Sequence, residues 1–458
     1  MNKLAFFFIA ATLILNAACN RKTPSDWVPP NFIIMIADDA AWNDAGAYGH
    51  PNIQTPHVDN LAEEGMLFTN AYLTISSCSP SRASIMTGQY PHNTGAGYLH
   101  APLPAEKLIF PGELKKAGYY TASAGKWHLG PKRMEFDTIV AGGPSGCENW
   151  VDVLKNRPEN KPFFFWFAAF DPHRGYEENI IPEPHTNEDA VVPPFLPDND
   201  STRKDLAMYY DEIARLDSYI GAVMEELKAQ GVDENTMVIY MSDNGRPFPR
   251  CKTRLYDSGI KTPFIVRWPS IVEAGTVTHS FISSVDIAPT LLELATGEIP
   301  DQFQGIPFSE ILIDPIAETR NMIFAEHNWH DYQAHERAVR NENYLYIRNA
   351  FPELNASPPA DAVRSPTYQK MITLHEKDAL EEDQKDCFVT PRPSEELYDV
   401  VNDPFQLTNL AEKEEFEKTL NKMRNQLNSW IEKTNDSIPE NPIPDKFDRW
   451  NGQKLANQ

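Results

Sequence analysis

The sequence predicts an α/β protein: a large, mostly parallel sheet sandwiched by helices, with a smaller α+β subdomain at its C-terminal end. Three observations support this fold. Short apolar runs end abruptly in polar residues, which is typical of buried parallel strands. Helix-like stretches separate these runs, and strands that alternate with helices form parallel sheets covered on both faces. From about residue 335 the chain changes to short strands and turns.

Three of the apolar runs are NFIIMIADD, PFFFWFAAFDPH and NTMVIYMSDNG. We expect each run to form a strand. In such sheets the ligand-binding residues gather at the carboxyl ends of the strands. The polar residues at these ends are Asp38 and Asp39, then Asp171 and His173, and then Asp243, Asn244 and Gly245.

Two helices are expected between the strands, in PGELKKAG and in the long stretch STRKDLAMYYDEIARLDSYIGAVMEELKAQG. A Ser or Thr is expected to cap the long helix, and Gly231 to end it. Short strands are indicated by ERAVRNENYLYIRNA and EELYDVVNDPFQLTNL. A charged amphipathic helix is expected after them, from Glu414 to about Lys433. We therefore place the main domain at residues 31–335 and the α+β subdomain at residues 336–458.

The first residues have the pattern of an export signal. Lys3 precedes an apolar run over residues 4–15, which is too short to span a bilayer as a helix. Cys19 follows two small residues, as in a bacterial lipobox. These features predict a signal peptide at residues 1–18, lipidation of Cys19 and a linker at residues 19–30. The predicted protein is an exported bacterial lipoprotein of the periplasm or outer membrane, held to a membrane only by this lipid. The alternative is a plain secreted protein cleaved nearby.

The formal net charge of −24 argues against binding to nucleic acid and against attraction to anionic lipid. Positive charge nevertheless gathers in one segment, SDNGRPFPRCKTRLYDSGIK. The cationic residues of this segment are Arg246, Arg250, Lys252, Arg254 and Lys261.

The five cysteines do not form the pattern of a disulfide framework. Cys19 belongs to the lipobox, and Cys78 lies in a separate polar motif. The remaining three, Cys147, Cys251 and Cys387, are an odd number, although a single bridge among them stays open.

Asp38, Asp39, Asp243 and Asn244 form an oxygen-rich set at separate strand ends. Hard cations such as Ca²⁺ or Mg²⁺ prefer such ligands, and carboxylates combined with a side-chain amide favour Ca²⁺. The alternative is that the DD and SDNG stretches are ordinary turns, because Asp, Asn and Gly are common turn residues. The occurrence of both after apolar strands favours the metal site.

A second group of residues is suited to an anion. Arginine offers a planar fork to tetrahedral oxyanions, lysine a point charge and histidine a proton near neutral pH. Taken singly, such lysines are more often solvated surface charges, and a histidine can be structural. The members of the group are Arg82, Lys126, His128, His173 and Lys252.

The stretch CSPSR matches Cys-x-Pro-x-Arg, the signature of the sulfatase family, and the following ASIMTGQYPHNTG is similar to that family as well. The order of the other motifs along the chain also agrees with the family: ADD precedes CSPSR, and GKWHLG, DPHR and SDNG follow it. The resemblance covers most of the chain, including ELYDVVNDPFQLTNLA. Within these formylglycine-dependent enzymes of alkaline-phosphatase-like fold, the chain most resembles the sulfamidase (N-sulfoglucosamine sulfohydrolase) branch and related bacterial polysaccharide sulfatases.

The resemblance implies that a formylglycine-generating enzyme converts Cys78 into formylglycine, and that Pro80 and Arg82 belong to its recognition signal. It also implies that residues 31–335 form a catalytic domain with one Ca²⁺ ion. The implied ligands of this ion are Asp38, Asp39, Asp243, Asn244 and the modified residue 78.

The implied reaction begins when one hydroxyl of the aldehyde hydrate at position 78 attacks sulfur. Arg82, Lys126 and Lys252 neutralise charge on the transferring group. His173 protonates the departing oxygen or nitrogen, and His128 orients or relays the proton of the second hydroxyl. The segment around the second lysine departs from the usual family pattern, so Arg254 is the fallback for Lys252.

The implied substrate is a sulfated oligosaccharide or polysaccharide. The sulfamidase likeness suggests an N-sulfated glucosamine at the end of a heparan-type chain, and the alternative is an O-sulfatase acting on algal ulvan or carrageenan. N- and O-sulfatases share their catalytic motifs because both break a bond to sulfur. Specificity is expected in loops such as NIIPEPHTNEDAVVPPFLPDND and near His327, His330 and His335. We interpret these histidines as sugar contacts or surface residues rather than metal ligands.

Two other classes of protein remain to be weighed. Phosphatases and phosphonate hydrolases share the architecture, but they ordinarily use a Ser or Thr nucleophile, so Cys78 favours sulfate. An inactive carbohydrate-binding lipoprotein is the other alternative. The intact nucleophile, charge and metal positions argue against it, since a binding module does not need all of them.

Overall fold

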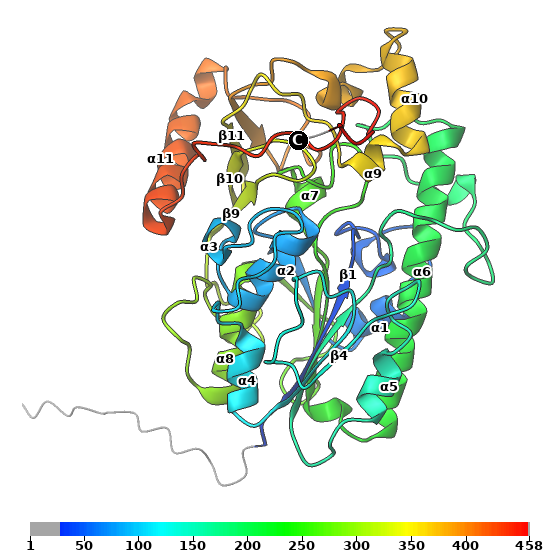
Figure 1. Ribbon diagram of the computed structural model, residues 1–458, viewed down its shortest axis with the longest axis vertical. Helices are drawn as coiled ribbons and strands as arrows, with labels where there is room; N and C mark the ends of the chain where they lie inside the picture. The colour runs from blue at the N-terminus through cyan, green and yellow to red at the C-terminus, as the bar shows by residue number, and fades with distance from the viewer. Residues whose placement is uncertain (1–27, 457–458) are drawn as a thin grey trace, which may run out of the picture.

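The computed structural model describes residues 28–456, which form a large eight-stranded sheet and a smaller four-stranded sheet (Figure 1). The large sheet has the order β4-β3-β5-β1-β6-β7-β2-β8, and β7 is its single reversed strand among the described residues. Its strands are β1 (Asn31–Ala37), β2 (Met66–Tyr72), β3 (Tyr120–Gly125), β4 (Thr138–Val140), β5 (Phe163–Ala168), β6 (Thr236–Ser242), β7 (Phe264–Arg267) and β8 (Thr276–Ser283). The prediction of a mostly parallel sheet is confirmed. The expected signal peptide and the lipidated Cys19 lie outside the described residues.

Strand β1 shows why the runs are apolar throughout. It pairs in parallel with β5 on one side and β6 on the other, and all seven of its residues are buried. Phe32 and Ile34 face one hydrophobic core, while Ile33 and Met35 face a second core on the opposite side of the sheet. A strand buried on both faces is apolar along nearly its whole length, in contrast to the alternating pattern of a half-exposed strand, and the one polar residue of β1, Asn31, is hydrogen-bonded to Thr236.

Helices cover both faces of the large sheet (Figure 1). Helices α2 (Cys78–Thr87), α4 (Phe110–Lys116) and α8 (Ile287–Thr296) pack on one face. The opposite face carries α1 (Pro56–Glu63), α5 (Trp150–Lys155) and α6 (Asp200–Ala229). This arrangement confirms the predicted sandwich.

The expected Ser or Thr cap of the long helix is wrong. The N-cap of α6 is Asn199, whose side-chain oxygen accepts hydrogen bonds from the backbone N–H groups of Ser201 and Thr202. Asn is as good an N-cap as Ser, and its extended backbone starts the helix two residues earlier than expected. The helix ends close to Gly231, which has a φ of 65° that favours glycine.

The reversed strand β7 determines the path of the basic segment. Strand β6 ends at Ser242, and its antiparallel neighbour β7 begins at Phe264. Residues 243–263, which include α7 (Asp257–Ile260), therefore leave and re-enter the sheet at the same edge. This is the edge at which β1 and β5 also end, because both run parallel to β6 or to its neighbour.

The smaller sheet is antiparallel, in the order β12-β11-β10-β9, and belongs to the C-terminal part of the chain. Val339, Tyr346 and Leu397 on one of its faces pack against α11, while Ala338 and Leu345 on the other face the large domain. The predicted α+β character of the C-terminal part is confirmed, but its sheet already begins with β9, before the expected boundary at residue 336. Its elements are β9 (Met322–His327), β10 (Glu336–Asn341), β11 (Tyr344–Asn349), α9 (Ala360–Val363), α10 (Pro366–His375), β12 (Glu395–Asp399) and α11 (Glu417–Thr434).

After α11 the chain returns across the top of the molecule (Figure 1). The backbone N–H of Lys446 donates to the carbonyl of Asp331, and Arg364 donates to the carbonyl of Gly452. This tail is thereby hydrogen-bonded next to the loop that carries His330 and next to helix α9, which carries Asp361. Among residues 28–456, no helix has the length and apolar character needed to cross a membrane.

Candidate active site

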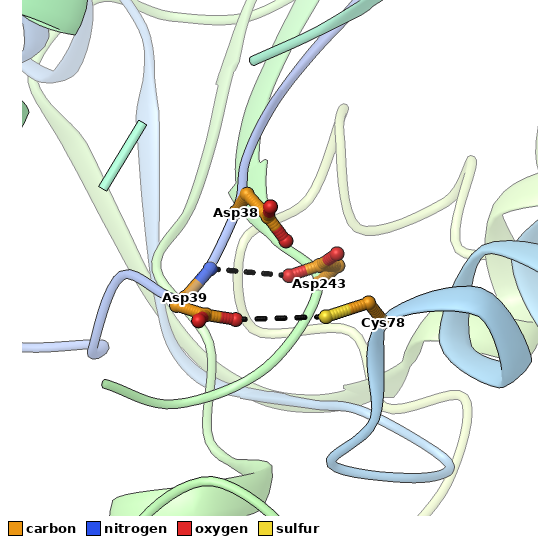
Figure 2. Close-up of side chains that lie close together, drawn as sticks. All are labelled: Asp38, Asp39, Cys78 and Asp243. Atoms are coloured by element: carbon orange, nitrogen blue, oxygen red, sulfur yellow. Dashed lines mark hydrogen bonds between the residues drawn. The ribbon is translucent and has the colours of Figure 1, made fainter. Parts of the chain in front are cut away.

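Four side chains from two strand ends and one helix start converge at the carboxyl edge of the large sheet (Figure 2). They are Asp38 and Asp39 after β1, Asp243 after β6, and Cys78 at the first position of α2. The backbone N–H of Asp39 donates to Asp243 Oδ1 at 3.2 Å, and Cys78 Sγ lies 3.6 Å from Asp39 Oδ1. One ligand atom from each residue lies within 4.8 Å of the others. The structure therefore gathers this predicted set in one place.

The donor atoms of the group fit a hard cation. Asp38 Oδ1 and Asn244 Oδ1 are buried and have no hydrogen-bond partner, which is costly unless a further group satisfies them. Asn244 Nδ2 donates to Asp39 Oδ1, so its amide oxygen is the atom left free. Carboxylate and amide oxygens are the ligands that Ca²⁺ prefers. The two unpartnered oxygens thus support the predicted metal site.

Helix α2 holds Cys78 and Arg82 on one face, because they are four residues apart. Arg82 is fully buried: its Nε donates to Asp243 Oδ2 at 2.8 Å, and its Nη1 donates to the carbonyl of Lys126 at 3.0 Å. Burial raises the pKa of the Cys78 thiol well above its usual value, although Lys126 and Lys252 oppose this shift. As encoded, the side chain is a neutral thiol and a poor nucleophile.

Two lysines meet the paired carboxylates of β1. Lys126, just after β3, donates to Asp38 Oδ2, and Lys252 donates to Asp39 Oδ2 at 2.7 Å. Burial would lower the pKa of Lys252, but Asp39 holds it well above the ordinary value, so the side chain is cationic. Burial would also lower the pKa of Lys126, but Asp38 holds this pKa above its ordinary value. The site therefore holds two fixed positive charges beside its carboxylates.

The other cations of the basic segment serve structural roles. Arg246 pairs with Asp44 at 2.5 Å, and Lys261 lies 4.0 Å above the ring of Trp42. Arg254, the fallback for the second lysine, pairs instead with Glu336 at 3.2 Å. The geometry therefore favours Lys252.

Asp243 differs from the neighbouring carboxylates in its proton affinity. Burial raises the pKa of Asp243 to about 7, and Asp38 adds to this shift while Arg82 opposes it. In Asp38 the balance is reversed, because Lys126 and the other nearby cations outweigh burial and hold its pKa well below the usual value. A bound cation would favour the charged form of Asp243.

His128 lies beside Lys126 and has an unexpected partner. Its Nε2 is 2.7 Å from Nδ1 of His100, a residue that the sequence reasoning did not select. His128 Nδ1 is buried and has no hydrogen-bond partner. Burial, reinforced by Lys126 and Arg82, lowers the pKa of His128 to about 2, so this ring is neutral at physiological pH.

His173 follows β5 and meets a second residue that the sequence reasoning missed. Its Nε2 lies 3.6 Å from Asp361 Oδ2, at the start of α9 in the C-terminal subdomain. Its Nδ1 lies 3.1 Å from the carbonyl oxygen of Arg174. Burial raises the pKa of Asp361, but Lys252, His173 and Arg174 outweigh it and lower this pKa to about 2.

The three later histidines were expected to be sugar contacts or surface residues, and the surface alternative is wrong for His330 and His335, which are buried. A sugar contact stays a prediction. His330 Nδ1 lies 2.7 Å from the hydroxyl of Ser77, the residue before Cys78. His327 pairs with Glu336. None of the three belongs to a possible metal-binding group among the described residues.

The four cysteines of the described residues are all free and buried: Cys78, Cys147, Cys251 and Cys387. The open possibility of one bridge is thereby excluded for these residues.

A pocket of about 790 Å³ opens beside the site and exposes its polar groups to a ligand. Its lining includes Asp38, Lys126, His128 and His173 of the predicted site, together with His100. Other lining residues are Trp127, Phe170, Arg174, Glu177, Glu212 and Arg215. Aromatic and hydrogen-bonding groups around a charged end are suited to a sugar that carries an anionic substituent.

Family comparisons agree with this site. A model described as Sulfatase matches residues 30–146 and 147–298. A second, described as N-sulphoglucosamine sulphohydrolase, C-terminal, matches residues 251–355. The chain belongs to the sulfatase family and is therefore a hydrolase of sulfate esters or sulfamates.

Two characterised relatives differ in the substrates that their names state. An ulvan-active sulfatase of Formosa agariphila is 32% identical over 92% of this chain and 78% of its own. The human N-sulphoglucosamine sulphohydrolase is 29% identical over 93% of both chains.

Solved structures support the fold. One protein, in complex with its substrate D-glucosamine-2-N,6-O-disulfate, has a TM-score of 0.69 at 21% identity, covering 90% of this chain and 99% of its own. A 2-O GAG sulfatase also has a TM-score of 0.69 at 21% identity, covering 89% and 93%.

Proposed function

We propose that the chain is a formylglycine- and calcium-dependent sulfatase that removes sulfate groups from a sulfated oligosaccharide or polysaccharide. One observation carries the proposal: Cys78 lies at the start of a helix between the carboxylates of Asp38, Asp39 and Asp243. Lys126 and Lys252 bound the same space. An acidic group that can hold a cation, next to fixed positive charges, matches the requirements of sulfuryl transfer.

The proposed ligands of one Ca²⁺ ion are Asp38, Asp39, Asp243, Asn244 and residue 78. When bound, this ion acts as a Lewis acid toward a sulfate oxygen and lowers the pKa of a coordinated hydroxyl. The formylglycine derived from Cys78 supplies the hydroxyl nucleophile as its hydrate, which the encoded neutral thiol does not. Conversion requires a formylglycine-generating enzyme as a maturation partner.

The remaining residues hold charge and move protons. Arg82, Lys126 and Lys252 offset the negative charge of the transferring group, and their buried ion pairs fix their positions before substrate arrives. His173 faces the pocket, where it donates a proton to the departing oxygen or nitrogen. His128 receives the proton of a hydroxyl at position 78 through its unpartnered Nδ1.

Two substrate classes have support. An N-sulfated glucosamine is favoured by the match of residues 251–355 to the N-sulphoglucosamine sulphohydrolase C-terminal model and by the human relative. An O-sulfated algal polysaccharide such as ulvan is favoured by the Formosa relative. Two further outcomes are distinguished by the same experiment. One is activity on carrageenan, and the other is a carbohydrate-binding role without sulfatase activity.

We test the function with protein co-produced with a formylglycine-generating enzyme and shown by peptide mass to carry formylglycine at position 78. Sulfate release is measured from N-sulfoglucosamine, O-sulfated glucosamines, and ulvan and carrageenan oligosaccharides. The matched control is Cys78→Ser. Release that is specific to the converted protein supports the proposal, and the responding substrate decides its class. Silence of fully converted, calcium-loaded protein on every substrate would favour the binding role.

The proposed location is the periplasm or outer membrane, with a lipid on Cys19. The N-terminal sequence supports this proposal. Radiolabelled palmitate should enter the wild type in a bacterial host but not a Cys19→Ala variant. Equal absence of label from both would leave a plain secreted protein as the correct description.

A further inference from the structure

His100 and His128 form a hydrogen-bonded imidazole pair on the wall of the active-site pocket. His128 Nε2 and His100 Nδ1 are 2.7 Å apart, and the ring centroids are 4.8 Å apart. The main-chain N–H of His100 donates to the hydroxyl of Ser79, in the first turn of the helix that begins with Cys78. The pair is therefore fixed to the element that carries the nucleophile.

The two rings differ in their access to water. His100 is exposed, whereas Nδ1 of His128 is buried and unpartnered. A proton that reaches the His100 ring can therefore leave to solvent, but a proton on His128 Nδ1 cannot.

The neighbouring charges decide which nitrogen of His128 carries its proton. Lys126 and Arg82 are the nearest cations that act on His128. A proton on the buried Nδ1 would be a donor without an acceptor in a ring whose surroundings are positive, which is unfavourable, whereas a proton on Nε2 has His100 as its acceptor. Nε2 of His128 is thus the donor of the 2.7 Å hydrogen bond, and Nδ1 of His100 is the acceptor.

We propose that His100 is a proton-relay residue, which allows His128 to act as a base without becoming an imidazolium. This rests on the function proposed above. His128 Nδ1 takes the proton of the free hydroxyl at position 78 while its Nε2 proton passes to His100 Nδ1. The O–H electron pair becomes the C=O bond of the aldehyde as the C–O bond to sulfate breaks, and sulfate leaves with that electron pair. His100 then loses a proton from Nε2 to water.

The electrostatics of the pair are consistent with a concerted transfer. Burial, Lys126 and Arg82 all disfavour a positive His128, so a stepwise transfer through its cation is costly. The charged and titratable groups that act on the pair are Asp38, Arg82, Lys126, His173, Lys252 and Lys446.

The test uses His100→Gly in the converted, calcium-loaded protein, because His100 has a φ of 63° that glycine adopts without strain. With 4-nitrophenyl sulfate we expect kcat to fall at least about 10-fold with little change in KM. This loss is smaller than the ~10²–10⁴-fold effect of a direct proton donor. Nitrophenol should be released in a burst of about one equivalent per site while inorganic sulfate lags. Imidazole added to the solution should restore part of kcat.

The matched control is His279→Asn, an exposed histidine on β8 that contacts Thr69. It should keep wild-type turnover and show no response to imidazole. An unchanged kcat in His100→Gly overturns the relay. A fall in kcat without a burst and without imidazole rescue also overturns it, because a sugar contact or a packing role would give that result.

A second measurement does not depend on turnover. In protein labelled with ¹⁵N-histidine, the His128 signals should report a proton on Nε2 and none on Nδ1, and the assignment follows from loss of these signals in His128→Asn. A proton on His128 Nδ1 overturns the relay. If the wild type is silent on every sulfate ester, the proposed function fails, while the ¹⁵N signals still decide the arrangement of the pair.

Discussion

Asp361 Oδ2 lies 3.6 Å from His173 Nε2, so the C-terminal subdomain contributes a carboxylate to a site otherwise built at the edge of the large sheet. The other ring nitrogen of His173 faces the carbonyl of Arg174, which can only accept a hydrogen bond. Nδ1 therefore donates to this carbonyl, and Nε2 is the ring nitrogen that faces the carboxylate of Asp361.

Replacing the carboxylate should weaken proton donation to the leaving group. In Asp361→Asn we expect kcat on a sugar sulfate to fall about 10- to 100-fold, within the usual range for general acid catalysis. The loss on 4-nitrophenyl sulfate should be much smaller, because nitrophenolate leaves without protonation. Steady-state kinetics on both substrates check this difference.

The control for this variant is Asp383→Asn, an exposed residue of the same subdomain. It should leave both rates unchanged. Equal losses of Asp361→Asn on the two substrates would show that Asp361 positions the sugar instead.

Lys252 and Arg254 should respond differently to loss of charge. Lys252→Met removes the cation on Asp39, and we expect a fall in kcat of about 10²- to 10³-fold, as for other groups that stabilise transition-state charge. Arg254→Met breaks the buried pair with Glu336, and we expect a loss of about 3–5 kcal/mol in unfolding free energy with most turnover retained in the folded protein. Urea unfolding and kinetics separate the two effects. If Arg254→Met lost turnover while Lys252→Met kept it, Arg254 would be the catalytic cation instead.

Calcium should stabilise the folded protein through the unpartnered oxygens of Asp38 and Asn244. At a free Ca²⁺ concentration 100 times Kd, the gain is about 2.7 kcal/mol, which raises Tm by several degrees. Asn244→Leu should lose this Ca²⁺-dependent increase, whatever its own starting Tm. Thermal unfolding with EGTA and with added Ca²⁺ measures it, and Asn156→Leu, at an exposed position, is the control. An undiminished shift in Asn244→Leu would contradict the proposed ligand set.

Asp217 should make stability depend on pH. Burial raises its pKa to about 6, although the backbone N–H groups of Val58 and His57 oppose the shift. The folded state then binds a proton that the unfolded chain has lost, so this residue destabilises the fold as pH rises from about 4 to about 6. We expect the unfolding free energy of the wild type, relative to Asp217→Asn, to fall by about 1–3 kcal/mol over this range. Urea unfolding at pH 4, 5, 6 and 7 provides the check. A pH-independent difference would argue against the shift.

The sequence predicted the parts of the fold and site that depend on local pattern. Asp38 and Asp243 could be found because apolar strands end at them, and Cys78 with Arg82 because both belong to the CSPSR stretch that resembles the family signature. Asp361 could not be found in this way, since it lies on a four-residue helix far along the chain from every motif.

His100 was missed for a related reason. It lies in an irregular turn, and its function depends on a ring 28 residues later. Long-range packing, rather than periodicity, brings His100 to the pocket and Asp361 to His173. The error at the start of α6 was of another kind, because Asn199 and the expected Ser or Thr offer the same chemistry to the helix.

The single reversed strand has a consequence for how such chains diverge. Because β6 and β7 are antiparallel neighbours, residues 243–263 need no crossover helix and pass entirely over the pocket edge of the sheet. Nearly all residues of this segment are buried, and Leu255, Tyr256 and Ile260 pack against the smaller sheet. A change in the length or charge of the segment that carries Lys252 therefore needs a matching change in the subdomain that covers it, while the hydrophobic layers of the large sheet can stay the same.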